Sequence, residues 1–215
     1  SCRWQARPAW WRTPAGAVPP PSQRRRALAD RLTLNQAEVH AHRVLHERDV
    51  VAAFGALDHA AAVPLDVRDA GVQVASVTLH VGVGTFRPIK VNLLEDHEMH
   101  AERGEIDQAT VDRIISCRAN EGRVISVGTT SVRVLETVAA EPELGPWEGE
   151  TSLFIRPPYQ FRLVDALITN FHLPRSTLLV LISCFAGREL VREAYRKAVE
   201  EKYRFFSYGD AMLIL

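Results

Sequence analysis

The chain has 215 residues, enough for one domain or one and a half, and carries 26 basic and 26 acidic side chains. This balance gives no global field that attracts nucleic acid, so an RNA partner would have to be held by a local patch. Three widely spaced cysteines indicate a reducing compartment, and the longest apolar run, Leu178 to Phe185, is too short to span a membrane. Without a secretory segment, we expect a cytoplasmic monomer that does not bind membranes.

The first third of the chain differs in composition from the rest. Residues 1–26 are rich in Trp, Pro and Arg without periodicity, which is typical of a disordered or artificial tail. Residues 27–70 are expected to be a separate helical segment, because apolar residues recur among Ala, Arg and Glu over 27–53. Residues 71–215 are expected to form a catalytic-type α/β domain.

Strand-like and helix-like stretches alternate from residue 72 onward. Alternating β-branched residues predict a strand over 72–80, and Asp107 is expected to cap a helix over about 108–120. The remaining strands are predicted near 123–127, 151–155 and 161–169 and after Phe205, and the remaining helices near 132–140, 176–185 and 188–201. This order predicts an α/β fold with a mostly parallel sheet and helices on both faces.

Two glycine-containing turns are candidates for ligand binding. Gly82 and Gly84 form a flexible turn that lets a ligand approach the backbone closely. The turn at Gly128 offers backbone N–H groups and the hydroxyls of Thr129, Thr130 and Ser131 at a helix N-terminus, which favours an anion. Arg133 would add a charged hydrogen bond. The alternative is an ordinary helix cap without a ligand.

Residues 95–102 contain the densest group of titratable side chains, Glu-Asp-His-Glu-Met-His-Ala-Glu. One interpretation is a metal site with His97 and His100 as ligands and His80 or His172 as the third. The other is general acid–base chemistry, because imidazole titrates near neutral pH and burial tunes carboxylates. The residues alone leave both open.

A polar loop with Asn170 and His172 follows an apolar strand and precedes a helix that begins at Ser176 or Thr177. Loops between a strand and a helix N-terminus are where α/β proteins place ligand-binding groups. Turn chemistry and capping are the alternative use of these side chains.

Five sequence blocks, in this order, resemble the S-adenosylmethionine:tRNA ribosyltransferase-isomerase family of queuosine biosynthesis. They lie at 78–88, 95–102, 126–133, 165–177 and 203–214. The resemblance runs from about Gly71 to the end. Family members are longer on the N-terminal side and include a β-barrel domain, so this part is expected to be largely missing here.

The resemblance implies an enzyme that uses S-adenosylmethionine as a ribosyl donor, with no metal. Such enzymes transfer the ribosyl unit to 7-aminomethyl-7-deazaguanine at the wobble position of tRNA and rearrange it, giving epoxyqueuosine, adenine and methionine. That reaction needs a base for a C5′ proton next to the sulfonium, an acid for the departing adenine, and a neutral amine.

Roles are placed on residues as hypotheses under this resemblance. His100, Glu102 and His172 are candidates for proton transfer, and Asp210 for binding ribose hydroxyls or the amine. Expected substrate-binding residues are His80, Arg87, Thr129, Thr130, Ser131, Arg133, Asn170, Phe171, Phe206 and Tyr208. The three aromatic rings among them would stack on a base, although core packing is an equal alternative.

Two other functions stay open at this point. One is a metal-dependent hydrolase that uses His97, His100 and His80. The other is a truncated fragment that binds ligand or RNA without catalysis.

Overall fold

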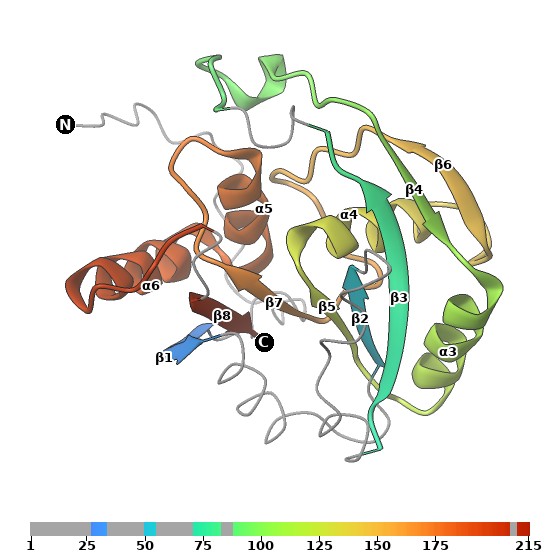
Figure 1. Cartoon of the computed structure of the whole chain (residues 1–215). Helices are drawn as coiled ribbons and strands as arrows, with labels where there is room; N and C mark the ends of the chain where they lie inside the picture. The colour runs from blue at the N-terminus through green and yellow to red at the C-terminus, as the bar shows by residue number, and fades with distance from the viewer. Residues whose placement is uncertain (1–26, 34–49, 55–70, 83–87, 207–209) are drawn as a thin grey trace, which may run out of the picture.

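The computed structural model describes residues 27–33, 50–54, 71–82, 88–206 and 210–215, the first two ranges as backbone only (Figure 1). Its strands are β1 Ala27–Thr33, β2 Val50–Phe54, β3 Gln73–His80, β4 Glu102–Ile106, β5 Val124–Val127, β6 Trp147–Thr151, β7 Ala166–Asn170 and β8 Asp210–Ile214. Its helices are α3 Gln108–Ala119, α4 Thr129–Val138, α5 Thr177–Ala186 and α6 Arg188–Glu200, with a short 3₁₀ turn, η5, at Leu94–Asp96.

The described strands form one mixed sheet in the order β1-β8-β7-β5-β2-β3-β4-β6. The four central strands, β7, β5, β2 and β3, pair in parallel, and both flanks pair in antiparallel fashion. The prediction of a mostly parallel sheet is therefore wrong for the flanks. The reason is that the described residues between β3 and β4 contain no crossover α-helix, so β4 begins at the edge where β3 ends. Between β7 and β8 two consecutive helices bring the chain back to the edge where β7 ends, and β8 therefore runs antiparallel to β7.

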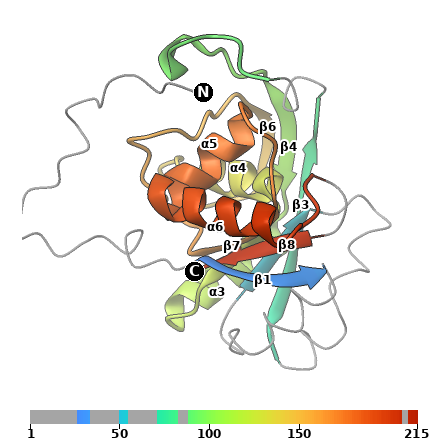
Figure 2. The same ribbon diagram turned by 90° about the vertical axis from the view of Figure 1, so that its left-hand side faces the viewer.

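The main core lies between the sheet and the helices. Apolar residues of α3, α4, α5 and α6 join those of β3, β5, β7 and β8 in one buried cluster. A smaller cluster on alternate strand positions, including Ile125, Ile168 and Leu213, contains no helical residue among those described. Within the described ranges the helices thus pack on one face, as Figure 2 shows, and the expected two-sided cover is not seen there.

The expectation of a helix over 27–53 is wrong at both ends of that range. Residues 27–33 pair with β8 at the edge, and residues 50–54 lie between β3 and β5 in the parallel centre. Helix propensity is a weak guide here, because pairing with neighbouring strands decides the conformation. The rest of the N-terminal 70 residues, including the tail expected at 1–26, lies outside the described residues.

The later elements agree better with the sequence predictions. The helices over 108–120, 176–185 and 188–201 are confirmed to within two residues, and Ser176 caps α5 by accepting from Leu179 N–H at 3.1 Å. The strand expected at 151–155 ends at Thr151 instead, and β4 has no sequence prediction. Both belong to the antiparallel flank, where only one strand face is buried.

The N-cap of α3 gives a testable contribution to stability. Asp107 Oδ1 accepts the backbone N–H of Thr110 at 2.7 Å. We expect Asp107→Ala to lower the free energy of unfolding by about 1 kcal/mol, measured by urea titration. Ser116→Ala, at an exposed position of the same helix, should change it by less than about 0.5 kcal/mol. Equal effects of the two substitutions would contradict this role of the cap.

Candidate functional site

The carboxyl edge of the central strands gathers most of the predicted site residues. Strands β3, β5 and β7 run in the same direction and end at this edge, with His80, Val127 and Asn170 as their last residues. The antiparallel strands β4 and β8 begin there, at Glu102 and Asp210. Ligands of α/β proteins commonly bind at this edge.

The N-terminus of α4 lies at this edge beside β7. Gly128 is its N-cap, with φ 87° and ψ 146° and no side-chain cap, and the Gly128 N–H donates to Ile168 O at 2.8 Å. Thr129 is buried and Thr130 half-buried. Ser131 is fully buried and its hydroxyl donates to Val127 O at 2.9 Å, so it fastens the turn internally. An uncapped helix N-terminus favours an anion.

The loop between β7 and α5 holds a buried histidine. His172 Nε2 lies 3.0 Å from Thr169 Oγ1, and the His172 backbone N–H donates to the hydroxyl of Tyr195, on α6, at 2.7 Å. Burial lowers the pKa of His172 to about 4. The imidazole is therefore neutral at physiological pH, with an unprotonated ring nitrogen available, although the same burial makes it a weaker base than a free imidazole.

His172 also gives the fold a pH dependence of known sign. Its folded pKa of about 4 lies below the ordinary value of 6.5, so the unfolded chain binds the extra proton first as the pH falls. Stability should therefore be full above about pH 6.5 and decrease towards pH 4 by up to about 3 kcal/mol from this group. Urea titrations over this range should show the slope, and His172→Gln should reduce it. An unchanged slope in His172→Gln would rule out His172 as its source.

The segment between α6 and β8 returns to the end of β7. Asn170 Nδ2 donates to Asp210 O at 3.2 Å. The buried Asp210 carboxylate pairs with Arg204, whose Nη2 lies 2.8 Å from Oδ1 and whose backbone N–H also donates to it. Asn170 and Asp210 are thus neighbours, as the predicted site requires.

The two described aromatic candidates differ in environment. Phe171 is fully buried and packs against the rings of Tyr195, Tyr203 and Phe205. It therefore belongs to the core, and this position argues against the predicted stacking on a base. Phe206 is 37% exposed and has a left-handed φ of 66°, with its N–H donating to Phe171 O at 2.7 Å. A non-glycine residue held at positive φ is strained, and such strain clusters at functional sites.

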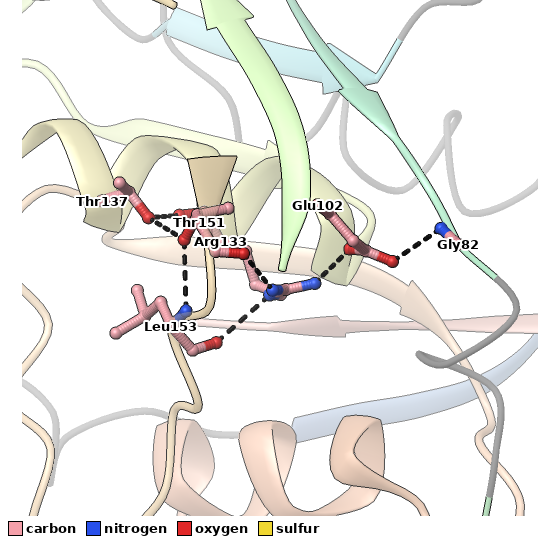
Figure 3. Close-up of polar contacts among 6 residues, drawn as sticks. All are labelled: Gly82, Glu102, Arg133, Thr137, Thr151 and Leu153. Atoms are coloured by element: carbon pink, nitrogen blue, oxygen red, sulfur yellow. Dashed lines mark hydrogen bonds and ion pairs between the residues drawn. The ribbon is translucent and has the colours of Figure 1, made fainter. Parts of the chain in front are cut away.

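Glu102 and Arg133 form a buried ion pair next to the end of β3 (Figure 3). The second carboxylate oxygen, Oε1, accepts the Gly82 N–H at 2.8 Å. Arg133 Nε and Nη2 donate to the carbonyls of Leu153 and Thr151 at 3.2 and 3.1 Å. Both side chains thus interact with the protein itself, which argues against the predicted proton transfer by Glu102 and anion binding by Arg133.

The other three histidines in the described ranges lie in different environments from the buried His172. His80 and His100 are exposed, and the His97 ring packs edge-on against Phe154 with centroids 5.2 Å apart. In the described ranges, no three His, Cys, Asp or Glu side chains lie together as potential metal ligands. Nothing in the geometry therefore favours the hydrolase alternative.

Three further findings delimit the site. Arg87 and Tyr208 lie outside the described residues. A hollow of about 430 Å³ is lined by residues between Val138 and Trp147, at the C-terminal end of α4, and includes no predicted site residue. Among the helices that the structure describes, none has the length and hydropathy needed to cross a bilayer.

Sequence reasoning missed one buried carboxylate, Glu136 in α4. It is fully buried and accepts four hydrogen bonds, from Tyr159 Oη and from the backbone N–H groups of Arg162, Leu163 and Val164, at 2.9–3.0 Å. The signal was present, because Glu136 is the only acidic residue in the run Val132 to Val138. A lone acid in an apolar helix needs partners inside the protein.

Comparison with known proteins identifies a family and several relatives for this chain. The family model for queuosine biosynthesis proteins matches residues 15–214. The chain is 58% identical over 145 residues to the S-adenosylmethionine:tRNA ribosyltransferase-isomerase of Thermotoga petrophila, which is 67% of this chain and 43% of that protein. Identity to the enzyme of that name from Coxiella burnetii (strain CbuG_Q212) is 59% over 148 residues, covering 69% and 43%.

A solved structure agrees with these sequence matches. The crystal structure of S-adenosylmethionine tRNA ribosyltransferase from Thermotoga maritima superposes with a TM-score of 0.58 at 49% identity, covering 69% of this chain and 47% of that one. The chain thus spans less than half the length of the relatives it matches.

Proposed function

Since the chain belongs to the queuosine biosynthesis protein family, we propose that it takes part in transferring and isomerising the ribosyl group of S-adenosylmethionine onto tRNA. The acceptor is 7-aminomethyl-7-deazaguanine at the wobble position, and the products are epoxyqueuosine, adenine and methionine. The reaction takes place in the cytoplasm, with the protein as a monomer. Because the chain spans 43% of its relatives' length, the complete activity, its substrates and its partners are all part of this proposal.

The observation that carries the proposal is the convergence of three groups at the carboxyl edge. These are the uncapped N-terminus of α4, the neutral buried His172 and the adjacent pair Asn170 and Asp210. Gly128 N–H bonds to Ile168 O, so the first two groups are tied to the same strand end. A base is one of the groups that the reaction requires, and an anion-binding helix end and polar side chains suit the methionine carboxylate and the ribose of the donor.

Each group has a role in the proposed chemistry. The sulfonium acidifies the C5′ protons of the donor, and His172 accepts one of them. When Nε2–H donates to Thr169 Oγ1, Nδ1 is left as the accepting atom. The backbone N–H groups at Thr129 and Thr130 hold the methionine carboxylate, and Asp210 with Asn170 orients the ribose or the amine. Phe206 stacks on a base, which stabilises binding by about 1–3 kcal/mol.

Incubation of the purified chain with S-adenosylmethionine and precursor tRNA tests the proposal. We expect free adenine, no methylated RNA, and a tRNA mass that increases by the transferred ribosyl unit. Adenine release without a change in tRNA mass would contradict transfer. Binding of S-adenosylmethionine without adenine release would support the non-catalytic fragment instead.

A further inference from the structure

The ion pair between Glu102 and Arg133 is more deeply buried than any other in the described part of the chain. The two side chains are 1% and 2% exposed, whereas every other ion pair there has at least one partner that is 30% exposed or more. Burying two charges costs more than their attraction returns unless further hydrogen bonds satisfy them. Glu102 and Arg133 have such bonds, but an apolar pair of similar volume is often as stable as a buried ion pair, so stability alone is a weak explanation for this one.

The pair connects four segments that are far apart in sequence. Glu102 starts β4 and reaches the Gly82 N–H just beyond β3. Arg133, on α4, donates to carbonyl oxygens of Thr151 and Leu153 at the end of β6. Thr151 adds a hydroxyl contact of 2.6 Å with Thr137 on α4. Figure 3 shows a connected series of contacts from Thr137 through Thr151, Arg133 and Glu102 to Gly82, with Leu153 as a side branch.

The carboxylate of Glu102 binds the β3 chain just beyond the point where its backbone pairing with β4 ends. The pairing of β3 with β4 runs from Thr78 opposite Glu105 to His80 opposite Arg103. Gly82 lies two residues beyond it, is exposed and has no side chain that packs. Its hydrogen bond to Glu102 thus ties the Gly82 backbone to the start of β4 at the site edge.

We infer that Glu102 and Arg133 are positioning residues that hold the backbone at Gly82 for the donor substrate without touching that substrate. The inference rests on the proposed function for the identity of the donor, S-adenosylmethionine. A glycine fixed at the carboxyl edge lets a ligand approach the main chain closely. The inference replaces the proton-transfer role expected for Glu102 and the anion-binding role expected for Arg133.

A double substitution separates positioning from stability. Changing only one partner leaves a buried unpaired charge, so the main variant is Glu102→Leu with Arg133→Met, which keeps an apolar pair of similar volume. The matched control is Arg103→Gln, because Arg103 also pairs across β4 and β6, with Glu148, but is 65% exposed. Amide hydrogen exchange at Gly82, and the kcat and KM for adenine release over a pH series, are measured for each protein.

We expect the double variant to fold, to exchange the Gly82 amide at least about tenfold faster, and to raise KM for S-adenosylmethionine about tenfold. Its kcat should stay within about threefold and the shape of its pH profile should not change. Arg103→Gln should match the original protein in every measurement. Loss of one limb of the pH profile would show instead that Glu102 transfers a proton, and unchanged exchange and KM would overturn the inference.

Failure of the proposed function would be recognised separately. If the original protein released no adenine, the exchange measurement would still decide whether the pair holds Gly82. Faster exchange spread evenly over β3, β4 and β6 would contradict positioning, because it would indicate general loosening of the sheet.

Discussion

Replacement of His172 by alanine is expected to lower the rate of adenine release by at least about 100-fold, with the fold retained. His172 is buried just beyond the end of β7, and burial lowers its pKa to about 4, so the ring is neutral at pH 7 and has an unprotonated nitrogen. Its orientation is set by Thr169 on one side and by the Tyr195 hydroxyl, through the backbone, on the other. Removal of the ring removes the proton acceptor and leaves both partners in place.

The matched control for this substitution is His97→Ala. His97 lies in the group of acidic and histidine residues before β4, but its ring packs against Phe154 rather than facing His172. We expect its effect on adenine release to stay within about threefold. Circular dichroism establishes that both variants fold. A folded His172→Ala protein with normal adenine release would exclude His172 from the mechanism.

The histidines also show what sequence can and cannot decide about the site. His172 follows an apolar strand and precedes a capped helix, and this local pattern correctly predicts a loop at the end of β7. His100 lies in a richer titratable cluster, yet it is exposed and does not join His172. Composition identifies groups that can carry protons, whereas only the fold determines which of them meet.

The sheet likewise shows which parts of the fold the sequence can predict and which it cannot. The parallel centre follows from alternating strand and helix patterns, which are local and were predictable around β5 and β7. The flanks depend on β1, β4 and β6, of which β1 pairs with β8 and β4 with β6, residues distant in sequence. Their backbone conformation is decided by cross-strand neighbours rather than by intrinsic propensity, so sequence reasoning assigned helix to 27–33 and left β4 out.

Phe171 and Phe206 give a third reason why the sequence alone does not define the site. Both lie next to polar residues in the matching blocks, so the sequence predicts a stacking role equally well for either ring. Only packing separates them: Phe171 lies within a cluster of three aromatic rings, whereas Phe206 is held at positive φ at the surface. A buried ring cannot stack on a substrate without leaving the core, which costs about 3–5 kcal/mol when a Phe is removed outright.

Glu136→Ala is expected to destabilise the fold by about 3–5 kcal/mol, the largest effect on stability that we predict. The substitution leaves three backbone N–H groups, of Arg162, Leu163 and Val164, without their acceptor, and two of these residues are buried. Each unsatisfied buried donor costs about 1–3 kcal/mol. Urea unfolding at neutral pH measures the loss, and Glu141→Ala, at an exposed position just beyond α4, should change stability by less than about 0.5 kcal/mol.

Two milder substitutions separate the acceptor from the charge. Tyr159→Phe removes one donor to Glu136 and leaves the backbone donors satisfied, so it should cost only about 1–2 kcal/mol. Glu136→Gln keeps one accepting oxygen but points an NH₂ group at other donors, so its loss of unfolding free energy should lie between those of Tyr159→Phe and Glu136→Ala. If Glu136→Gln were as stable as the original protein, solvent rather than the carboxylate would be satisfying these N–H groups.

The segment that Glu136 holds leads directly into β7. Its loosening should therefore also reduce the protection of Asn170 and His172 from amide exchange.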